Sequence, residues 1–148
     1  MKQKELHKRY IKNTEKGALV KEVRALLCHL GKWVRNILRV TEYKIYIKTR
    51  VLKHLYDRRN AQEYDFILEN LMTIVKSPDK LYLNKSEKRG EFVFYKNINN
   101  RGILCSIQKN ETDDSFDIVT AFTGKDLTSY LKNFEILYPP EGLPLEQD

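Results

Sequence analysis

The second half of the chain has the hydrophobic pattern of short strands, and this feature limits the fold more than any other. Its strand-like segments are rich in β-branched, aromatic and aliphatic residues and cover residues 81–83, 91–95, 103–107 and 116–122. The polar connections between them are too short for parallel crossovers, which need a dozen or more residues. The pattern therefore predicts an antiparallel meander.

The residues before the meander predict one further strand and two helices. Residues 43–49 alternate between apolar and polar side chains, as a half-buried strand does. Residues 50–59, which Thr49 can cap, and residues 62–75 have apolar side chains at helical spacing. With a last short helix at 126–134, this order predicts an α+β domain. Its helices would pack on one face of a four- to five-stranded antiparallel sheet.

A further helix is predicted near the N-terminus, where apolar residues from Leu19 to Ile37 recur at steps of three and four. Gly31 is a point at which this helix can bend or break. We expect a basic helical arm over residues 1–38, a domain over 39–138 and a loosely ordered tail over 139–148. The face opposite the apolar stripe carries basic residues at helical spacing, namely Lys21, Arg24, Lys32 and Arg35.

Charge is distributed unevenly along the chain of 148 residues, which has a net charge of +7. Residues 1–60 hold 17 basic and 5 acidic side chains, whereas residues 61–148 hold 10 and 15. A positive section of this kind suits a polyanion, because neutralised phosphates release counterions. RNA, DNA and an anionic membrane surface fit this charge, and so does a surface that only keeps the protein soluble.

Hydropathy and cysteine content exclude several classes of protein. No apolar run approaches the roughly 20 residues of a membrane span, and residues 1–13 are not followed by the apolar region of a secretion signal. Cys28 and Cys105 form no C-x-x-C pair, and we expect both to be buried thiols in a reducing cytoplasm. His7, His29 and His54 lack metal-binding spacing, so we expect no metal and no other cofactor.

His54 is the histidine whose neighbours suggest chemistry. On the predicted helix over residues 50–59, it shares a face with Arg50, Asp57 and Arg58. Like charge from the arginines disfavours the imidazolium form, whereas Asp57 favours it. These residue types suit an acid or base near neutral pH, and they also fit an ordinary surface histidine.

Thr120 lies in the last strand-like segment. The alternation predicts that Thr120 and Phe122 lie on one face of this strand. Threonine is a common strand former, so its position alone assigns it no function. The opposite face would carry Val119, Ala121 and Thr123.

Taken in order, several segments resemble the phage-associated nucleases of the barnase, EndoU, colicin and RelE superfamily. The resemblance covers about residues 40–138 and leaves the basic N-terminal segment unexplained. It is carried by residues 47–55 (IKTRVLKHL), Arg58-Arg59, residues 77–79 (SPD), residues 92–96 (FVFYK) and residues 118–122 (IVTAF).

The resemblance implies an endoribonuclease that needs no metal, with its active site on a face of the sheet. In this chemistry the ribose 2′-hydroxyl attacks the adjacent phosphate and leaves a cyclic phosphate and a free 5′-hydroxyl end. Such a reaction needs a base, an acid and cations that stabilise the phosphorane. A toxin or a phage-encoded effector fits this activity. RNA would be the partner, and whether an inhibitory antitoxin or immunity protein also binds is left open.

The resemblance also implies roles for individual residues. His54 matches the helix histidine and would be the acid or the base, and Thr120 matches the last-strand hydroxyl and would hold the phosphate. Arg58 is the first choice for the basic partner, with Arg59 and Lys96 as alternatives. Tyr95 would stack on a base or orient the phosphate. Apart from the resemblance, positive charge alone predicts that Arg50 and the basic residues Lys21, Arg24, Lys32 and Arg35 contact RNA.

Two other functions are open at this point. The first is a module without catalysis, whose basic surface binds nucleic acid or an acidic partner. The second is dimerisation through the apolar stripe of the N-terminal helix.

Overall fold

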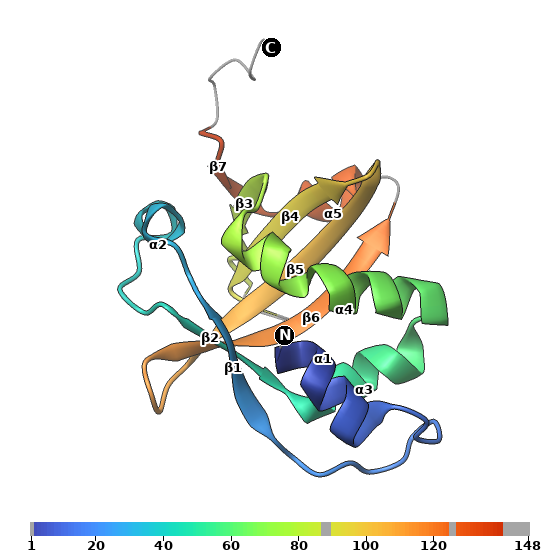
Figure 1. Cartoon of the computed structure of the whole chain (residues 1–148). Coiled ribbons are helices and arrows are strands. Elements are labelled where there is room, and N and C mark those ends of the chain that lie inside the picture. The colour runs from blue at the N-terminus through green and yellow to red at the C-terminus, as the bar shows by residue number, and fades with distance from the viewer. Residues whose placement is uncertain (1, 87–89, 125–126, 141–148) are drawn as a thin grey trace.

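Strands from both ends of the chain meet in one seven-stranded sheet, with the order β1-β2-β6-β5-β4-β3-β7 (Figure 1). The computed structural model describes residues 2–86, 90–124 and 127–140. The strands are β1 (Arg24–His29), β2 (Lys44–Lys48), β3 (Lys80–Leu83), β4 (Phe92–Ile98), β5 (Arg101–Asn110), β6 (Ser115–Gly124) and β7 (Glu135–Tyr138). The helices are α1 (Lys2–Leu6), the π-helix η1 (His7–Ile11), α2 (Lys32–Leu38), α3 (Thr49–Arg58), α4 (Ala61–Lys76) and α5 (Thr128–Leu131).

The predicted α+β class is confirmed, whereas the sheet is larger than predicted and is mixed. The five predicted strands correspond to β2 through β6. β1 and β7 extend the sheet as antiparallel edge strands. The prediction of a purely antiparallel sheet is wrong for β2 and β6, which pair in parallel, with Ile45 opposite Phe116. Two helices and three strands separate β2 from β6 along the chain, so the length required for a parallel return is present.

The predicted basic helix between Leu19 and Ile37 is wrong. Residues 24–29 form β1, and α2 begins only after Gly31, which adopts an extended conformation. Pairing with β2 gives the backbone of β1 hydrogen bonds that a helix would have made locally, and tertiary pairing of this kind overrides helical spacing.

A bulge in β1 explains why the strand is hard to recognise. Leu26 pairs with Tyr46 and Cys28 pairs with Ile45, so Leu27 is an extra residue in the ladder. Leu27 and Cys28 are both buried although they are consecutive, and the period of two is lost at this point.

The apolar residues of the N-terminal segment do not form one stripe. Leu19 is 99% exposed, whereas Leu30 and Val34 lie in the protein's own core. The stripe that suggested a dimer surface is therefore absent from the described residues, because its members lie on a loop, a strand edge and a short helix.

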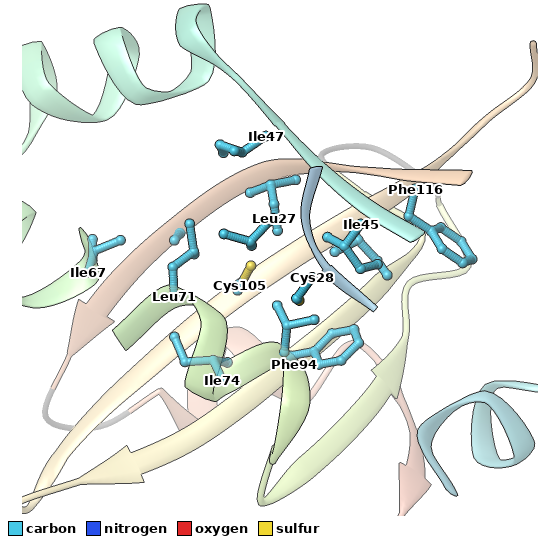
Figure 2. Packing of buried hydrophobic residues seen from close by; sticks show 14 of the residues in the cluster. Leu27, Cys28, Ile45, Ile47, Ile67, Leu71, Ile74, Phe94, Cys105 and Phe116 are labelled. Atoms are coloured by element: carbon cyan, nitrogen blue, oxygen red, sulfur yellow. The ribbon is translucent and has the colours of Figure 1, made fainter. Parts of the chain in front are cut away.

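The main core lies between the sheet and α4 (Figure 2). Asn60 caps α4 by accepting a hydrogen bond from the backbone N–H of Glu63 at 2.8 Å. Cys28 and Cys105 are buried here as free thiols, as predicted, and burial raises the pKa of Cys28 to about 11. The α4 side chains in this core include Ile67, Leu71 and Ile74, which face Leu27, Ile45, Ile47, Phe94 and Phe116 of the sheet.

The opposite face of the sheet carries a second cluster, so the prediction that helices cover only one face is wrong. Leu131 of α5 packs there against Tyr82, Val93 and Leu104. The helix predicted over residues 126–134 is shorter than expected, since α5 covers only Thr128–Leu131. Residues 135–138, for which no element was predicted, form β7. Asp126 and residues 141–148 of the predicted tail lie outside the described residues.

α3 begins where β2 ends and packs against η1. The prediction that Thr49 caps this helix is wrong, because Thr49 is its buried first residue. The Thr49 hydroxyl donates to the carbonyl oxygen of Lys21 at 2.6 Å and accepts from the backbone N–H of Val23 at 2.9 Å. These bonds fix the start of α3 to the segment that precedes β1.

In the ranges that the structure describes, no helix combines the length and apolar character that a membrane crossing requires.

Candidate functional site

A β-bulge in β6 shapes the centre of the candidate site. Ser106 of β5 pairs with Thr120, and the next residue, Ile107, pairs with Ile118, so Val119 has no partner of its own. Ile118 and Ala121 are buried in the main core, so Val119 and Thr120 stand between two inward-facing residues. Bulges of this kind redirect side chains and are frequent beside active sites.

For β6 residues after the bulge, the structure confirms which side chains were predicted to lie on each face of the strand. Phe122 packs in the second cluster, and Ala121 packs in the main core. Thr123 also faces the helices, since its hydroxyl and its backbone N–H lie 3.0 and 2.9 Å from Oε2 of Glu63 on α4. The prediction that Val119 shares a face with Ala121 is wrong, because Val119 is the bulge residue and lines the same pocket as Thr120.

One pocket of about 460 Å³ is lined by His54, Arg58, Arg59, Val119 and Thr120. α3 contributes the histidine and Arg58, Arg59 follows this helix directly, and the β6 bulge contributes the remaining two. The structure thus brings together the histidine, the threonine and both arginines that the sequence singled out. They meet because the helix that follows β2 continues alongside β6.

Three of these side chains are free to act on a ligand. His54 and Arg58 are exposed and Thr120 is half-buried. Within residues 2–86, 90–124 and 127–140, none of the three side chains makes a hydrogen bond or an ion pair. An imidazole, a guanidinium and a hydroxyl therefore face one pocket with their bonding capacity unused.

Asp57 does not interact with His54, contrary to the prediction. Its carboxylate accepts hydrogen bonds from Nζ of Lys53 at 2.7 Å and from the backbone N–H of Gly17 at 3.0 Å. The hydrogen bond from Lys53 is the main reason why the pKa of Asp57 lies below its ordinary value. Lys53 is itself buried and also donates to the carbonyl oxygen of Glu15 at 2.6 Å. The pair anchors the loop after η1 to α3.

Arg59 is held in place, unlike Arg58. Its Nη2 and Nε lie 3.1 and 3.3 Å from the carbonyl oxygen of Ala121, and its Nε lies 3.9 Å from Oε2 of Glu63. Arg59 thereby joins the end of α3 to a part of β6 that does not pair with β2. Its positive charge remains at the pocket wall.

A second pocket, of about 540 Å³, adjoins the first and shares His54 and Val119 with it. Its cations are Lys48, at the end of β2, and the predicted RNA contact Arg50. Sequence reasoning missed several of its residues. Lys48 falls within residues 47–55, which carry the resemblance, but nothing in the sequence alone singles out Gln108. The lining is Lys48, Arg50, Val51, His54, Gln108, Asp117, Ile118 and Val119.

Carboxylates surround the guanidinium of Arg24, one of the predicted RNA contacts. Its Nε donates to Asp117 at 2.7 Å, its Nη1 donates to Asp113 at 2.6 Å, and the guanidinium carbon lies 3.8 Å from the ring centre of Tyr46. Hydrogen bonds from Ser115 and then Arg24 hold the pKa of Asp113 below its ordinary value. Arg24 thus organises the carboxylates beside the second pocket.

The remaining predicted RNA contacts are dispersed. Tyr95 packs against the second cluster, and Lys96 is bound to the carbonyl oxygen of Ser77 at 2.7 Å. Lys32 and Arg35 lie on α2, at the end of β2 remote from α3. Lys21 is exposed next to the start of α3, to which its carbonyl group is bonded.

Among the residues that the structure describes, no three His, Cys, Asp or Glu side chains gather as a metal site would require.

Residues 35–128 match the model of one family, described as phage-Barnase-EndoU-ColicinE5/D-RelE like nuclease3. No curated protein and no solved structure matches the chain. The matched residues contain β2 to β6, α3, α4 and every residue that lines the two adjoining pockets. The chain belongs to the phage-Barnase-EndoU-ColicinE5/D-RelE like nuclease family.

Proposed function

We propose that this protein is an endoribonuclease whose reaction centre is the pocket between α3 and the bulge of β6. The observation that carries the proposal is the gathering of three unpartnered groups, those of His54, Arg58 and Thr120, in one pocket of a nuclease-family chain. The charged side chains nearby are mostly engaged in ion pairs, as Lys53 and Arg24 are. Free functional groups thus occur together where a phosphodiester could bind.

The proposed reaction transfers the phosphoryl group within the RNA strand. The 2′-oxygen forms a bond to phosphorus, the bond from phosphorus to the 5′-oxygen breaks, and a 2′,3′-cyclic phosphate results. The proton of the 2′-hydroxyl ends on the departing 5′-oxygen, so the step consumes no water and no other reactant. His54 carries out one of these proton transfers, as base or as acid, because an imidazole can both accept and donate a proton and this one faces the pocket.

Arg58 and Thr120 would act on the phosphate. The pentavalent phosphorane carries more negative charge on its oxygens than the phosphodiester does, and a guanidinium offers several N–H donors to that charge. The Thr120 hydroxyl adds a donor from the sheet side. Arg59, fixed on Ala121, contributes positive potential without moving, which is how preorganised groups stabilise a transition state.

Cleavage of RNA would make the protein toxic to a cell that contains it, consistent with a toxin or a phage-encoded effector. A partner that covers the α3–β6 pocket would then silence it.

The test is incubation of the purified full chain with an end-labelled RNA in the presence of a chelator. We expect fragments that end in 2′,3′-cyclic phosphate and 5′-hydroxyl groups. His54→Ala should lower the rate of RNA cleavage by about 10²-fold or more. His29→Ala should leave this rate unchanged, because His29 is also an exposed histidine but lies on β1. Binding of RNA with a steep salt dependence and no cleavage would instead identify a binding module.

A further inference from the structure

The pocket next to the reaction centre has no role in the chemistry described so far. It shares His54 and Val119 with the first pocket, so the two hollows meet at the histidine. A phosphodiester reacting at His54 has a nucleotide on each side. The second pocket is therefore within reach of a nucleotide next to the scissile phosphate.

The dimensions and walls of the second pocket suit a nucleotide. Its volume of about 540 Å³ lies within the range of small-molecule sites. Val51 and Val119 supply apolar surface for a base, and Lys48 and Arg50 supply positive charge for a phosphate. Arg50 is 68% exposed and lies 3.7 Å from Glu22, a loose pair that a phosphate can displace.

Gln108 and Asp117 supply the polar groups that could recognise a base. They are directly opposite each other on β5 and β6, so their side chains leave the sheet on the same face, side by side. The side-chain amide of Gln108 is half-buried and makes no hydrogen bond within the described ranges. Its one acceptor and its N–H donors are available to a ligand.

Asp117 is held rigidly and retains acceptor capacity. Arg24 donates to its Oδ1 at 2.7 Å, Asn110 donates to its Oδ2 at 2.9 Å, and Nζ of Lys48 lies 3.9 Å from Oδ2. An ionised carboxylate has about four lone-pair positions, so positions remain for a donor from a ligand. A carboxylate can only accept, which makes it selective for bases that donate.

We propose that this pocket is the base-recognition subsite of the ribonuclease, and that it takes a nucleotide whose base carries an exocyclic amino group. The proposal rests on the proposed function for its place next to the scissile phosphate. Gln108 exchanges a donor and an acceptor with the base edge, and Asp117 accepts from the amino group. Uracil has a single N–H and two carbonyl groups, so it presents a carbonyl oxygen where the amino group would lie.

Cytidine and uridine 5′-monophosphates separate base recognition from stacking and from phosphate binding, because they differ only on the pairing edge of the base. We would titrate the full, ¹⁵N-labelled protein with each and follow the amide signals. The expected result is at least about tenfold tighter binding of the cytidine nucleotide, the size of one good paired contact to a base. Perturbed signals should fall at residues 48–54, 108 and 117–119.

Gln108→Leu keeps a side chain of similar size and breaks no hydrogen bond within the described part of the chain. It should reduce the preference to about twofold or less. The matched control is Gln62→Leu, at an exposed glutamine on α4, which should keep the full preference. Lys48→Gln should weaken both nucleotides alike, because it removes only charge.

Equal affinity of the wild-type protein for the two nucleotides would overturn the proposal, as would a preference that survives Gln108→Leu. The proposal would also be overturned if the nucleotides perturbed only amide signals of residues outside this pocket. These readouts need no cleavage. If the protein prefers the cytidine nucleotide but cuts no RNA, the base-recognition subsite is supported and the ribonuclease activity is not. If it cuts RNA but shows no preference between the two nucleotides, the activity is supported and the subsite is not.

Discussion

Arg58 and Arg59 are consecutive at the end of α3, yet their guanidinium groups have opposite surroundings. Arg59 donates two hydrogen bonds to the carbonyl oxygen of Ala121, at 3.1 and 3.3 Å, and so fastens the helix to β6. Arg58 is exposed at the same pocket and has no hydrogen bond or ion pair in the described ranges. One arginine therefore supports the site, and the other is available to the substrate.

This difference predicts different effects on stability. Arg59→Ala should lower the free energy of unfolding by about 1–2 kcal/mol, because a hydrogen bond from a charged donor is lost and the Ala121 carbonyl keeps no replacement. Arg58→Ala should change it by less than about 0.5 kcal/mol and should still reduce RNA cleavage at least tenfold. Urea unfolding and cleavage assays on both variants would check this. A loss of stability in Arg58→Ala equal to that in Arg59→Ala would show that the two roles are not separate.

Deletion of Val119 tests whether the bulge positions Thr120. Without Val119, Ile118 would still pair with Ile107 and Thr120 with Ser106, so inward and outward faces of β6 are preserved. We expect a folded protein whose cleavage rate falls by about 10²-fold, since displacement of a catalytic group by about 1 Å has that effect. Circular dichroism and cleavage kinetics would measure both. Full activity in the deletion variant would show that the bulge is dispensable.

Asp57 predicts an acid-sensitive contribution to stability. Its pKa is lowered in the folded protein, chiefly by the hydrogen bond from Lys53, so its contribution is complete above the unfolded-state pKa and is lost as pH falls through the folded-state value. Asp57→Asn should cost about 1–3 kcal/mol at pH 7, because buried Lys53 loses a charged partner.

The difference in unfolding free energy between wild type and Asp57→Asn should shrink between about pH 5 and pH 2, as the wild-type carboxylate takes up its proton. Asp114→Asn is the control, since this exposed turn residue has φ 53°, a conformation that asparagine also adopts. A difference between wild type and Asp57→Asn that is independent of pH would contradict the role of the Lys53 contact.

The salt dependence of RNA binding tests which cations contact RNA. With the His54→Ala protein, Arg50→Gln should reduce the slope of log affinity against log salt by about 0.7, the value for one phosphate contact on a single strand. Lys96→Gln should leave the slope unchanged, because Lys96 is bound to Ser77 and Asp79 away from both pockets. Equal effects of the two substitutions would mean that RNA covers a different face.

The sequence predicted the local elements best where periodicity and end signals agree. β2, α3, α4 and the strands of the meander were all expected, and Pro78 follows shortly after the end of α4 at Lys76. The family was also recognisable, because its segments occur in order along residues 40–138. Neither depends on contacts between residues far apart in the sequence.

The two bulges account for much of what the sequence did not predict. In β1, the extra residue Leu27 interrupts the alternation, so apolar residues at spacings of three and four predicted a helix. In β6, Val119 occupies a position that no alternation rule assigns to a face. A bulge depends on the partner strand as well as on its own residues, which is why neither could be predicted locally.

Helical spacing did not identify the partners that the charged side chains have in the fold. Arg24 was expected to bind RNA, but Asp113 and Asp117 lie next to it although they are far away in sequence. Asp57 was assigned to His54 by helical spacing, whereas Lys53 and the loop at Gly17 hold it. His54, Arg58 and Thr120 meet as expected, because the resemblance specified which side chains belong together and spacing alone did not.

The most direct test of the proposed ribonuclease activity is an RNA that carries a single 2′-deoxynucleotide on the 5′ side of a mapped cleavage point. If the 2′-hydroxyl is the nucleophile, cleavage at that point should fall by at least about 10²-fold while cleavage at other points continues at its usual rate. Undiminished cleavage at the substituted position would contradict the proposed chemistry at His54, Arg58 and Thr120.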